Sequence, residues 1–157
     1  MATGTLIATA IALILLVVTA YALVGGTLST AEVIAVAQSD VAKQQEIRLH
    51  TSISILDTHV EANTSTLFME VENAGSEVIG DFDHMDVYLC SGGDPAFYPR
   101  GSGPGTWSIV SISPDSIRPG MLDPGEVANL SVVYSGNPPE WVQVVTACGV
   151  YDSKYVS

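Results

Sequence analysis

Apolar side chains dominate the start of this chain, and no charge interrupts them. No charged side chain occurs from Met1 to Ala31, and Thr5–Val24 is almost wholly apolar. At a rise of 1.5 Å per residue, a helix of that length spans about 30 Å, the thickness of a bilayer's hydrocarbon core. The pattern therefore predicts an N-terminal helix in a membrane or in the core of a filament. The residues expected to face lipid or neighbouring helices are Leu6, Ile7, Ile11, Leu13, Leu15, Leu16, Val17 and Val18.

A cleaved secretory signal is the alternative interpretation of this segment. Such a signal has a basic n-region and an apolar core of about 7–15 residues. Here no Lys or Arg precedes the apolar run, and the run is longer than that core. The sequence therefore favours a helix that is retained.

A second helical pattern follows Gly25 and Gly26. Ala31–Leu49 is rich in good helix formers, and its apolar residues fall near one face. We expect helix over about residues 3–49, with a weak point at the two glycines. Such a helix needs lipid, a domain or copies of itself to cover its apolar surface.

From Thr51 onward the apolar residues alternate with polar ones, as in β-strands. The expected strands are Ser52–Val60, Ser65–Glu72, Met85–Cys90, Trp107–Ile112, Val127–Tyr134 and Trp141–Tyr151. The segments between them are rich in Pro and Gly, which is typical of turns and loops. Six or seven short strands with no helix between them favour an antiparallel sandwich. The predicted fold class is α+β, with a helical part over 1–50 and an all-β, Ig-like domain over 51–157.

Charge restricts the partners of the β-domain. The net charge of −12 argues against nucleic acid and against anionic membrane surfaces. Acidity, two glycosylation sequons at Asn63 and Asn129, and two cysteines all suggest that the domain lies outside the membrane. Cys90 and Cys148 are too few for a zinc site. We expect a disulfide between them, with two separately buried thiols as the alternative.

The densest polar cluster contains Asp81, Asp83 and Asp86, whose carboxylates are of the type that calcium binds. Their spacing is not that of an EF-hand, and a solvated acidic loop is the favoured alternative. The three histidines lack metal-binding spacing, and no nucleophile elbow, P-loop or dinucleotide fingerprint occurs. We therefore expect neither catalysis nor a cofactor.

Two further segments have mainly structural interpretations. Leu122–Glu126 (LDPGE) is typical of a turn, in which the carboxylate of Asp123 is expected to cap the turn. Phe97, Tyr98 and Trp107 lie in or beside the long loop Ser91–Gly105, where they serve either loop packing or partner contact.

The chain resembles the archaeal flagellin (archaellin) superfamily, whose members join a type IV pilin-like helix to an Ig-like domain. The resemblance rests on the helix Met1–Ile47 and on the segments Leu67–Gly75, Met85–Leu89 and Ile117–Glu126. It implies a structural role in archaeal motility, at the envelope of an archaeon. The implied partners are copies of the chain or other archaellum proteins through the helix, the membrane, and surface-layer protein.

Within that superfamily the resemblance is strongest to the accessory proteins of the FlaF and FlaG type. Archaellins carry a short basic leader that is cut after a glycine, whereas here no basic residue precedes Ala2. If the sequence is the complete gene product, this difference favours an accessory, stator-type protein. If Met1 is the first mature residue, a filament subunit becomes the better interpretation. A tethered module that binds surface-layer protein or glycan is a third hypothesis.

Overall fold

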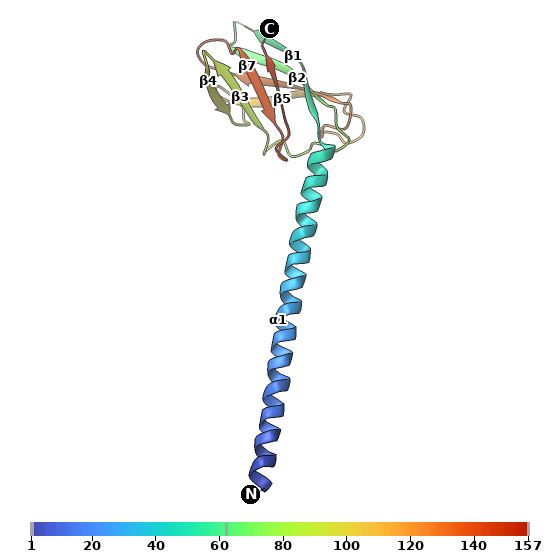
Figure 1. Cartoon of the computed structure of the whole chain (residues 1–157). Helices are drawn as coiled ribbons and strands as arrows, with labels where there is room; N and C mark the ends of the chain where they lie inside the picture. Colours follow the sequence, from blue (N-terminus) through green and yellow to red (C-terminus); the bar gives the residue numbers. More distant parts are fainter. Residues whose placement is uncertain (1, 62, 157) are drawn as a thin grey trace. The chain divides into compact units, whose positions relative to one another are not determined.

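The computed structural model describes residues 2–61 and 63–156. These residues form one helix, α1 (Ala2–His50), and a set of strands (Figure 1). The strands are β1 (Ile53–Glu61), β2 (Thr66–Asn73), β3 (Asp86–Ser91), β4 (Asp94–Tyr98), β5 (Trp107–Ser113), β6 (Val127–Val133), β7 (Trp141–Val145) and β8 (Tyr151–Tyr155). The chain divides into two compact units, Met1–Lys43 and Gln44–Ser157.

The first unit consists of α1 up to Lys43, and the helix runs through Gly25 and Gly26 without a break. Each glycine weakens a helix by about 1 kcal/mol relative to alanine. In the next turn, the hydroxyl of Thr27 donates to the carbonyl oxygen of Leu23 at 3.0 Å and that of Thr30 donates to the carbonyl oxygen of Gly26 at 2.9 Å.

The second unit is a sandwich of two antiparallel four-stranded sheets, as the alternating pattern predicted. One sheet has the strand order β1-β2-β6-β5 and the other β4-β3-β7-β8. Alternate residues of the inner strands point into a shared core, which excludes water from their apolar side chains. The fully buried side chains include Leu67, Met69, Val71, Val87, Leu89, Trp107, Leu130, Val132, Val142 and Val144.

Polar side chains tie the edges of the two sheets together on one side of the sandwich. The backbone N–H of Ile55 in β1 donates to the carboxylate of Asp152 in β8 at 2.8 Å. Lys154, also in β8, donates to the carbonyl oxygens of Ile55 and Leu56. These bonds satisfy backbone groups of β1 at the point where the register of its pairing with β2 shifts, between Ile55 and Asp57. The edge formed by β1 and β8 is therefore covered by side chains.

Two predicted elements were wrong in detail. The expected strand Trp141–Tyr151 is two strands, because Thr146–Val150 forms a turn in which Gly149 has a φ of 80°. The expected loop Ser91–Gly105 contains β4, which pairs with β3 through a two-residue turn at Gly92 and Gly93. Their φ values of 64° and 90° suit such a hairpin, which glycine adopts without steric cost.

The end of α1, from Gln44 onward, belongs to the second unit and is fixed within it. Thr51 closes the last turn, since its N–H and its hydroxyl both donate to the carbonyl oxygen of Ile47, at 2.9 and 2.8 Å. The carbonyl oxygen of His50 accepts from the N–H groups of Ser76 and Glu77, at 2.8 and 3.1 Å. The turn after β2 thus provides donors for the otherwise unsatisfied helix end.

Candidate functional surfaces

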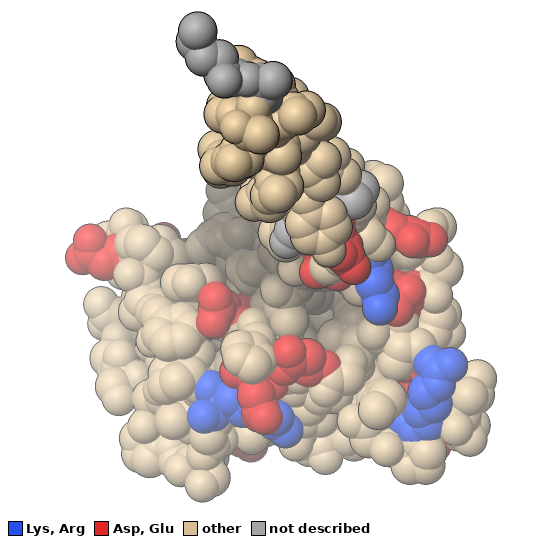
Figure 2. Space-filling model, turned by 90° about the horizontal axis from the view of Figure 1, so that it is seen from below, with Lys and Arg blue, Asp and Glu red and all other residues tan. Residues whose placement is uncertain are grey.

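The apolar surface of α1 is the largest candidate interaction surface. The eight side chains predicted to face lipid or other helices are 54% to 68% exposed, and they lie all around the helix rather than on one side. By length and composition, α1 is apolar enough to cross a membrane. Figure 2 shows the near part of the helix without any charged side chain. A helix that is apolar all round needs lipid or other helices to cover it.

The acidic segment before β3 does not gather its three carboxylates. The carboxylate of Asp81 accepts from Nδ1 of His84 at 2.8 and 2.9 Å, and that of Asp83 pairs with the guanidinium of Arg100. The bond to Asp81 raises the pKa of His84, and the same bond lowers the pKa of Asp81. No group of three or more His, Cys, Asp or Glu within 2–61 and 63–156 is arranged to hold a metal ion. Calcium binding by this loop is not tested by these contacts, and the solvated acidic loop stays the favoured prediction.

Arg100 covers part of the core next to that loop. Its guanidinium lies 5.8 Å from the ring centre of Phe82 and 6.0 Å from that of Trp107. Trp107 is fully buried, so this aromatic residue serves packing, whereas Phe97 is 52% exposed and Tyr98 is half-buried. Of the three aromatics of the long loop, Phe97 is the one that is available for contact.

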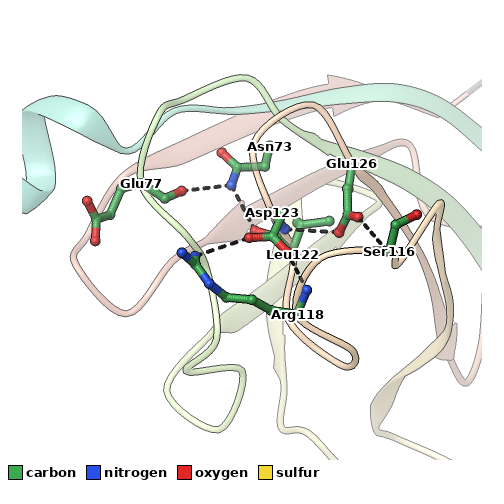
Figure 3. A network of polar contacts seen from close by, with 7 residues as sticks. All are labelled: Asn73, Glu77, Ser116, Arg118, Leu122, Asp123 and Glu126. Carbon is green, nitrogen blue, oxygen red and sulfur yellow. Dashed lines mark hydrogen bonds and ion pairs between the residues drawn. The ribbon is translucent and has the colours of Figure 1, made fainter.

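The segment Ile117–Glu126 forms a buried polar network that is structural (Figure 3). The carboxylate of Asp123 accepts from the backbone N–H and the guanidinium of Arg118, at 3.0 and 3.1 Å. The expectation that Asp123 caps its own turn was wrong. Glu126 does so, because its carboxylate accepts from the N–H groups of Asp123 and Ser116, at 3.1 and 3.2 Å. Gly125, with a φ of 81°, completes the predicted Pro–Gly turn.

Asn73 connects this network to the end of β2. Its side-chain amide donates to the carbonyl oxygens of Glu77 and Leu122, at 2.8 and 2.9 Å (Figure 3). The side chain is fully buried. The buried Asp123, Glu126 and Asn73 are therefore all engaged in holding loops.

The predicted disulfide between Cys90 and Cys148 was wrong, since both cysteines are free. Cys90 pairs with Trp141 at the start of β7, whereas Cys148 follows the end of β7 at Val145. The two residues lie at opposite ends of the β3–β7 pair, which puts them more than about 10 Å apart at a rise of about 3.4 Å per residue. A disulfide needs Cα atoms within about 7 Å.

The two sequons differ in their surroundings. Asn63 is exposed in the turn between β1 and β2. Asn129 lies in β6, between β2 and β5, and its side-chain amide donates to the hydroxyl of Ser111 at 3.3 Å. Glycosylation of either residue stays a prediction.

An exposed aromatic surface on the sheet β4-β3-β7-β8 was missed from the sequence. Residues directly opposite each other in antiparallel strands project to the same face. The strand pairings place Phe97, Tyr88, Gln143 and Ser153 in one row across this sheet, and Pro95, Cys90, Trp141 and Tyr155 in the next. Val87, Leu89, Val142 and Val144 alternate with these residues and are buried, so both rows lie on the outer face.

The aromatic rings of this outer face are close to one another or open to solvent. The ring centres of Tyr88 and Phe97 are 5.5 Å apart, and Tyr155 is 79% exposed. A hollow of about 610 Å³ on this face is lined by Tyr88, Cys90, Gly93, Pro95, Glu140, Trp141, Gln143 and Tyr155. The alternation in Met85–Cys90 already placed Tyr88 opposite to Val87 and Leu89, but its neighbours depend on a strand order that the sequence does not contain.

No family model matches this chain. An uncharacterized protein from Archaeoglobus fulgidus is 30% identical to it over 133 residues, which cover 82% of this chain and 79% of that protein.

Two solved structures show the same fold. One is the archaellum periplasmic stator protein FlaG from Sulfolobus acidocaldarius, with a TM-score of 0.52 and 20% identity over 66% of this chain and 97% of that chain. The other belongs to the stator protein complex of FlaF and FlaG from the same organism, with a TM-score of 0.53 and 20% identity over 65% of this chain and 85% of that chain. The α+β architecture predicted from the sequence thus resembles that of FlaG.

Proposed function

This chain belongs to the same protein family as the Archaeoglobus fulgidus protein, and we propose that it is a non-enzymatic accessory component of the archaellum, of the stator type. The observation that carries the proposal is a FlaG-like fold in a chain whose helix α1 has an uncharged and mostly apolar run up to Ala31. The helix anchors the chain in the cytoplasmic membrane of an archaeon. The sandwich acts on the outer side of that membrane.

The charge distribution supports this placement. The five cations, Lys43, Arg48, Arg100, Arg118 and Lys154, all lie beyond the apolar run, together with every one of the acidic residues. A domain with such an excess of acid does not adhere to anionic lipid headgroups. The sandwich therefore stands clear of the membrane and is available to other envelope proteins.

The proposed partner is another archaellum protein, as in the FlaF–FlaG complex of Sulfolobus acidocaldarius. The helix contributes lateral contacts to other helices. Ala8, Thr9, Ala10 and Ala12 are small, and small side chains let helices approach closely in lipid. Surface-layer protein is a further proposed partner for the sandwich.

A non-enzymatic role agrees with the use of the buried polar groups. Asn73, Asp123 and Glu126 hold loops through hydrogen bonds within the chain. Catalytic groups are typically positioned in a concave site with perturbed pKa values. These buried polar residues serve the fold of the sandwich, which agrees with a structural role.

A gene deletion tests the proposal. Cells without the gene are expected to grow normally and to assemble filaments that they cannot rotate, so that swimming is lost while filaments remain visible by negative-stain electron microscopy. Complementation with the full chain is expected to restore swimming. Loss of the filaments themselves would instead indicate a filament subunit or an assembly factor, and normal swimming would overturn the archaellum assignment.

A further inference from the structure

We propose that the outer face of the sheet β4-β3-β7-β8 binds a lysine or arginine side chain of a basic partner polypeptide. The site is the hollow lined by Tyr88, Trp141, Tyr155 and Glu140. The inference rests on the geometry of this sheet, and it is independent of a role in an archaellum.

The strand register brings the three aromatic residues onto one face. Trp141 lies opposite Tyr155 on one side and opposite Cys90 on the other, and Tyr88 is two residues before Cys90 on the same face of β3. Trp141 and Tyr88 are half-buried, whereas Tyr155 is largely exposed. The walls of the hollow are thus held by the sheet, and one ring remains free to close over a ligand.

Glu140 is fixed at the border of this hollow by its backbone. Its N–H donates to the carbonyl oxygen of Cys90 at 2.8 Å, and its carbonyl oxygen accepts from the N–H of Val156 at 3.0 Å. These two bonds connect it to β3 and to the residue after β8. Among residues 2–61 and 63–156, no side chain pairs with its carboxylate. The backbone of Glu140 is therefore held at the border of the hollow, and its exposed side chain can turn toward a cation there without a backbone rearrangement.

Aromatic rings and a carboxylate together select a cation. The faces of Trp and Tyr rings attract Lys and Arg, and a nearby carboxylate adds a direct charge interaction. No Lys or Arg lines the hollow, so an anionic ligand finds no counter-charge there. A neutral apolar partner would remove Glu140 from water without a partner, which is unfavourable.

A second copy of this chain is a poor source of that cation. Three of the five cations are engaged within the chain, since Arg100 pairs with Asp83, Arg118 pairs with Asp123, and Lys154 donates to the carbonyl oxygens of β1. The other two, Lys43 and Arg48, lie on α1. Two copies that each carry a net charge of −12 also repel each other. Charge complementarity therefore points to a different polypeptide, one that is rich in Lys or Arg.

The test is a binding titration of the full chain in neutral detergent micelles at about 0.15 M ionic strength, where diffuse surface electrostatics are screened beyond about 8 Å. The probe is a peptide of alternating arginine and glycine, and the matched probe carries citrulline in place of arginine. Calorimetry gives the dissociation constants. Tyr155→Leu removes an exposed ring without changing charge, and Glu140→Gln removes the carboxylate. Glu70→Gln removes the same charge from an exposed residue of β2, in the other sheet.

The arginine peptide is expected to bind the original chain, and the citrulline peptide is not. Tyr155→Leu is expected to weaken binding about two- to thirtyfold, the range of cation–π energies between exposed and desolvated sites. Glu140→Gln is expected to weaken it about two- to fivefold, the upper part of the range for an exposed ion pair. Glu70→Gln is expected to change it less than twofold. The proposal is overturned if the original chain does not bind the arginine peptide. It is also overturned if Tyr155→Leu has no effect, or if Glu70→Gln weakens binding as much as Glu140→Gln, because the peptide would then sense only net charge.

Discussion

Gly75 touches the end of α1 so closely that a side chain would force backbone atoms to shift: an added Cβ would lie 2.5 Å from the carbonyl oxygen of His50 and 2.5 Å from the backbone nitrogen of Ser52. The same turn donates hydrogen bonds to the carbonyl oxygens of His50 and Ser52. The exit of the helix into the sandwich is therefore fixed by backbone atoms on both sides of the contact. Neither partner is a flexible side chain that can move away.

We expect Gly75→Ala to destabilise the sandwich by about 1–3 kcal/mol, because backbone atoms must shift to accommodate the methyl group. Thermal unfolding of the full chain in detergent, followed by circular dichroism, measures the loss. Gly80→Ala is the matched control, since an added Cβ there meets only the flexible side chain of Met121 at 3.4 Å. Equal melting temperatures for the two variants would contradict the tight contact.

Asn73→Ala is expected to cost about 2–3 kcal/mol. The substitution removes both amide donors and leaves the carbonyl oxygens of Glu77 and Leu122 without this partner, one of them in the core. Asn129→Ala serves as the control, because its single bond to Ser111 is exposed and long, at 3.3 Å. Chemical unfolding curves should separate the two variants clearly. A small effect at Asn73 would mean that water replaces its bonds.

The sequence predicted the elements that carry a repeating apolar pattern. The uncharged run before Glu32 identified the helix, and the alternation in Ser65–Glu72 identified β2. In contrast, β4 was missed because Asp94–Phe97 are all exposed and thus show no alternation. The boundary between β7 and β8 was missed because the turn at Thr146–Val150 lies within an apolar run.

Features that depend on strand order could not be predicted. The disulfide was expected because Cys90 and Cys148 both lie in β-rich segments, whereas the register shows that β7 separates them. The aromatic surface also depends on strand order, because β7 lies between β3 and β8 and so brings Tyr88 and Tyr155 onto one face. Sequence periodicity defines which side of a strand is apolar, but long-range pairing decides which residues meet.

Both thiols are expected to react in the native protein. Alkylation of non-reduced protein with iodoacetamide, followed by peptide mass mapping, should find Cys90 and Cys148 each modified and no peptide that contains both. Burial raises the pKa of the Cys148 thiol, but hydrogen bonds, first the one between its sulfur and the hydroxyl of Thr146 at 3.2 Å, outweigh it and lower this pKa overall. Thr146→Val should therefore raise the pH at which Cys148 is alkylated. If neither thiol reacts and the mass of the intact protein is lower by two hydrogens, the two cysteines form a disulfide after all.

His84 is expected to titrate above its ordinary pKa of 6.5, because its bond to Asp81 stabilises the protonated ring. The pair contributes to stability when His84 is charged and Asp81 is ionised. That contribution is present below pH 6.5 and is lost as the pH rises through the raised pKa of His84; it is also lost in acid, as the pH falls through the lowered pKa of Asp81. Proton NMR of the ring measures the shift. Asp81→Asn should return the pKa of His84 toward 6.5, and the distant Glu70→Gln should not.

The uncharged run of α1 before Glu32 is expected to anchor the protein in the membrane. Leu13 lies in the middle of the apolar run and is 63% exposed on α1. A charge at the centre of a membrane span costs about 2.5–3.5 kcal/mol on insertion scales, enough to reduce the inserted fraction strongly. Leu13→Arg should therefore move the protein from the membrane pellet to the soluble fraction, or abolish its assembly with partners. Gln38→Arg adds the same charge beyond the apolar run, so it should leave the pelleted fraction unchanged. If both variants pellet like the original chain, the apolar run does not anchor the protein.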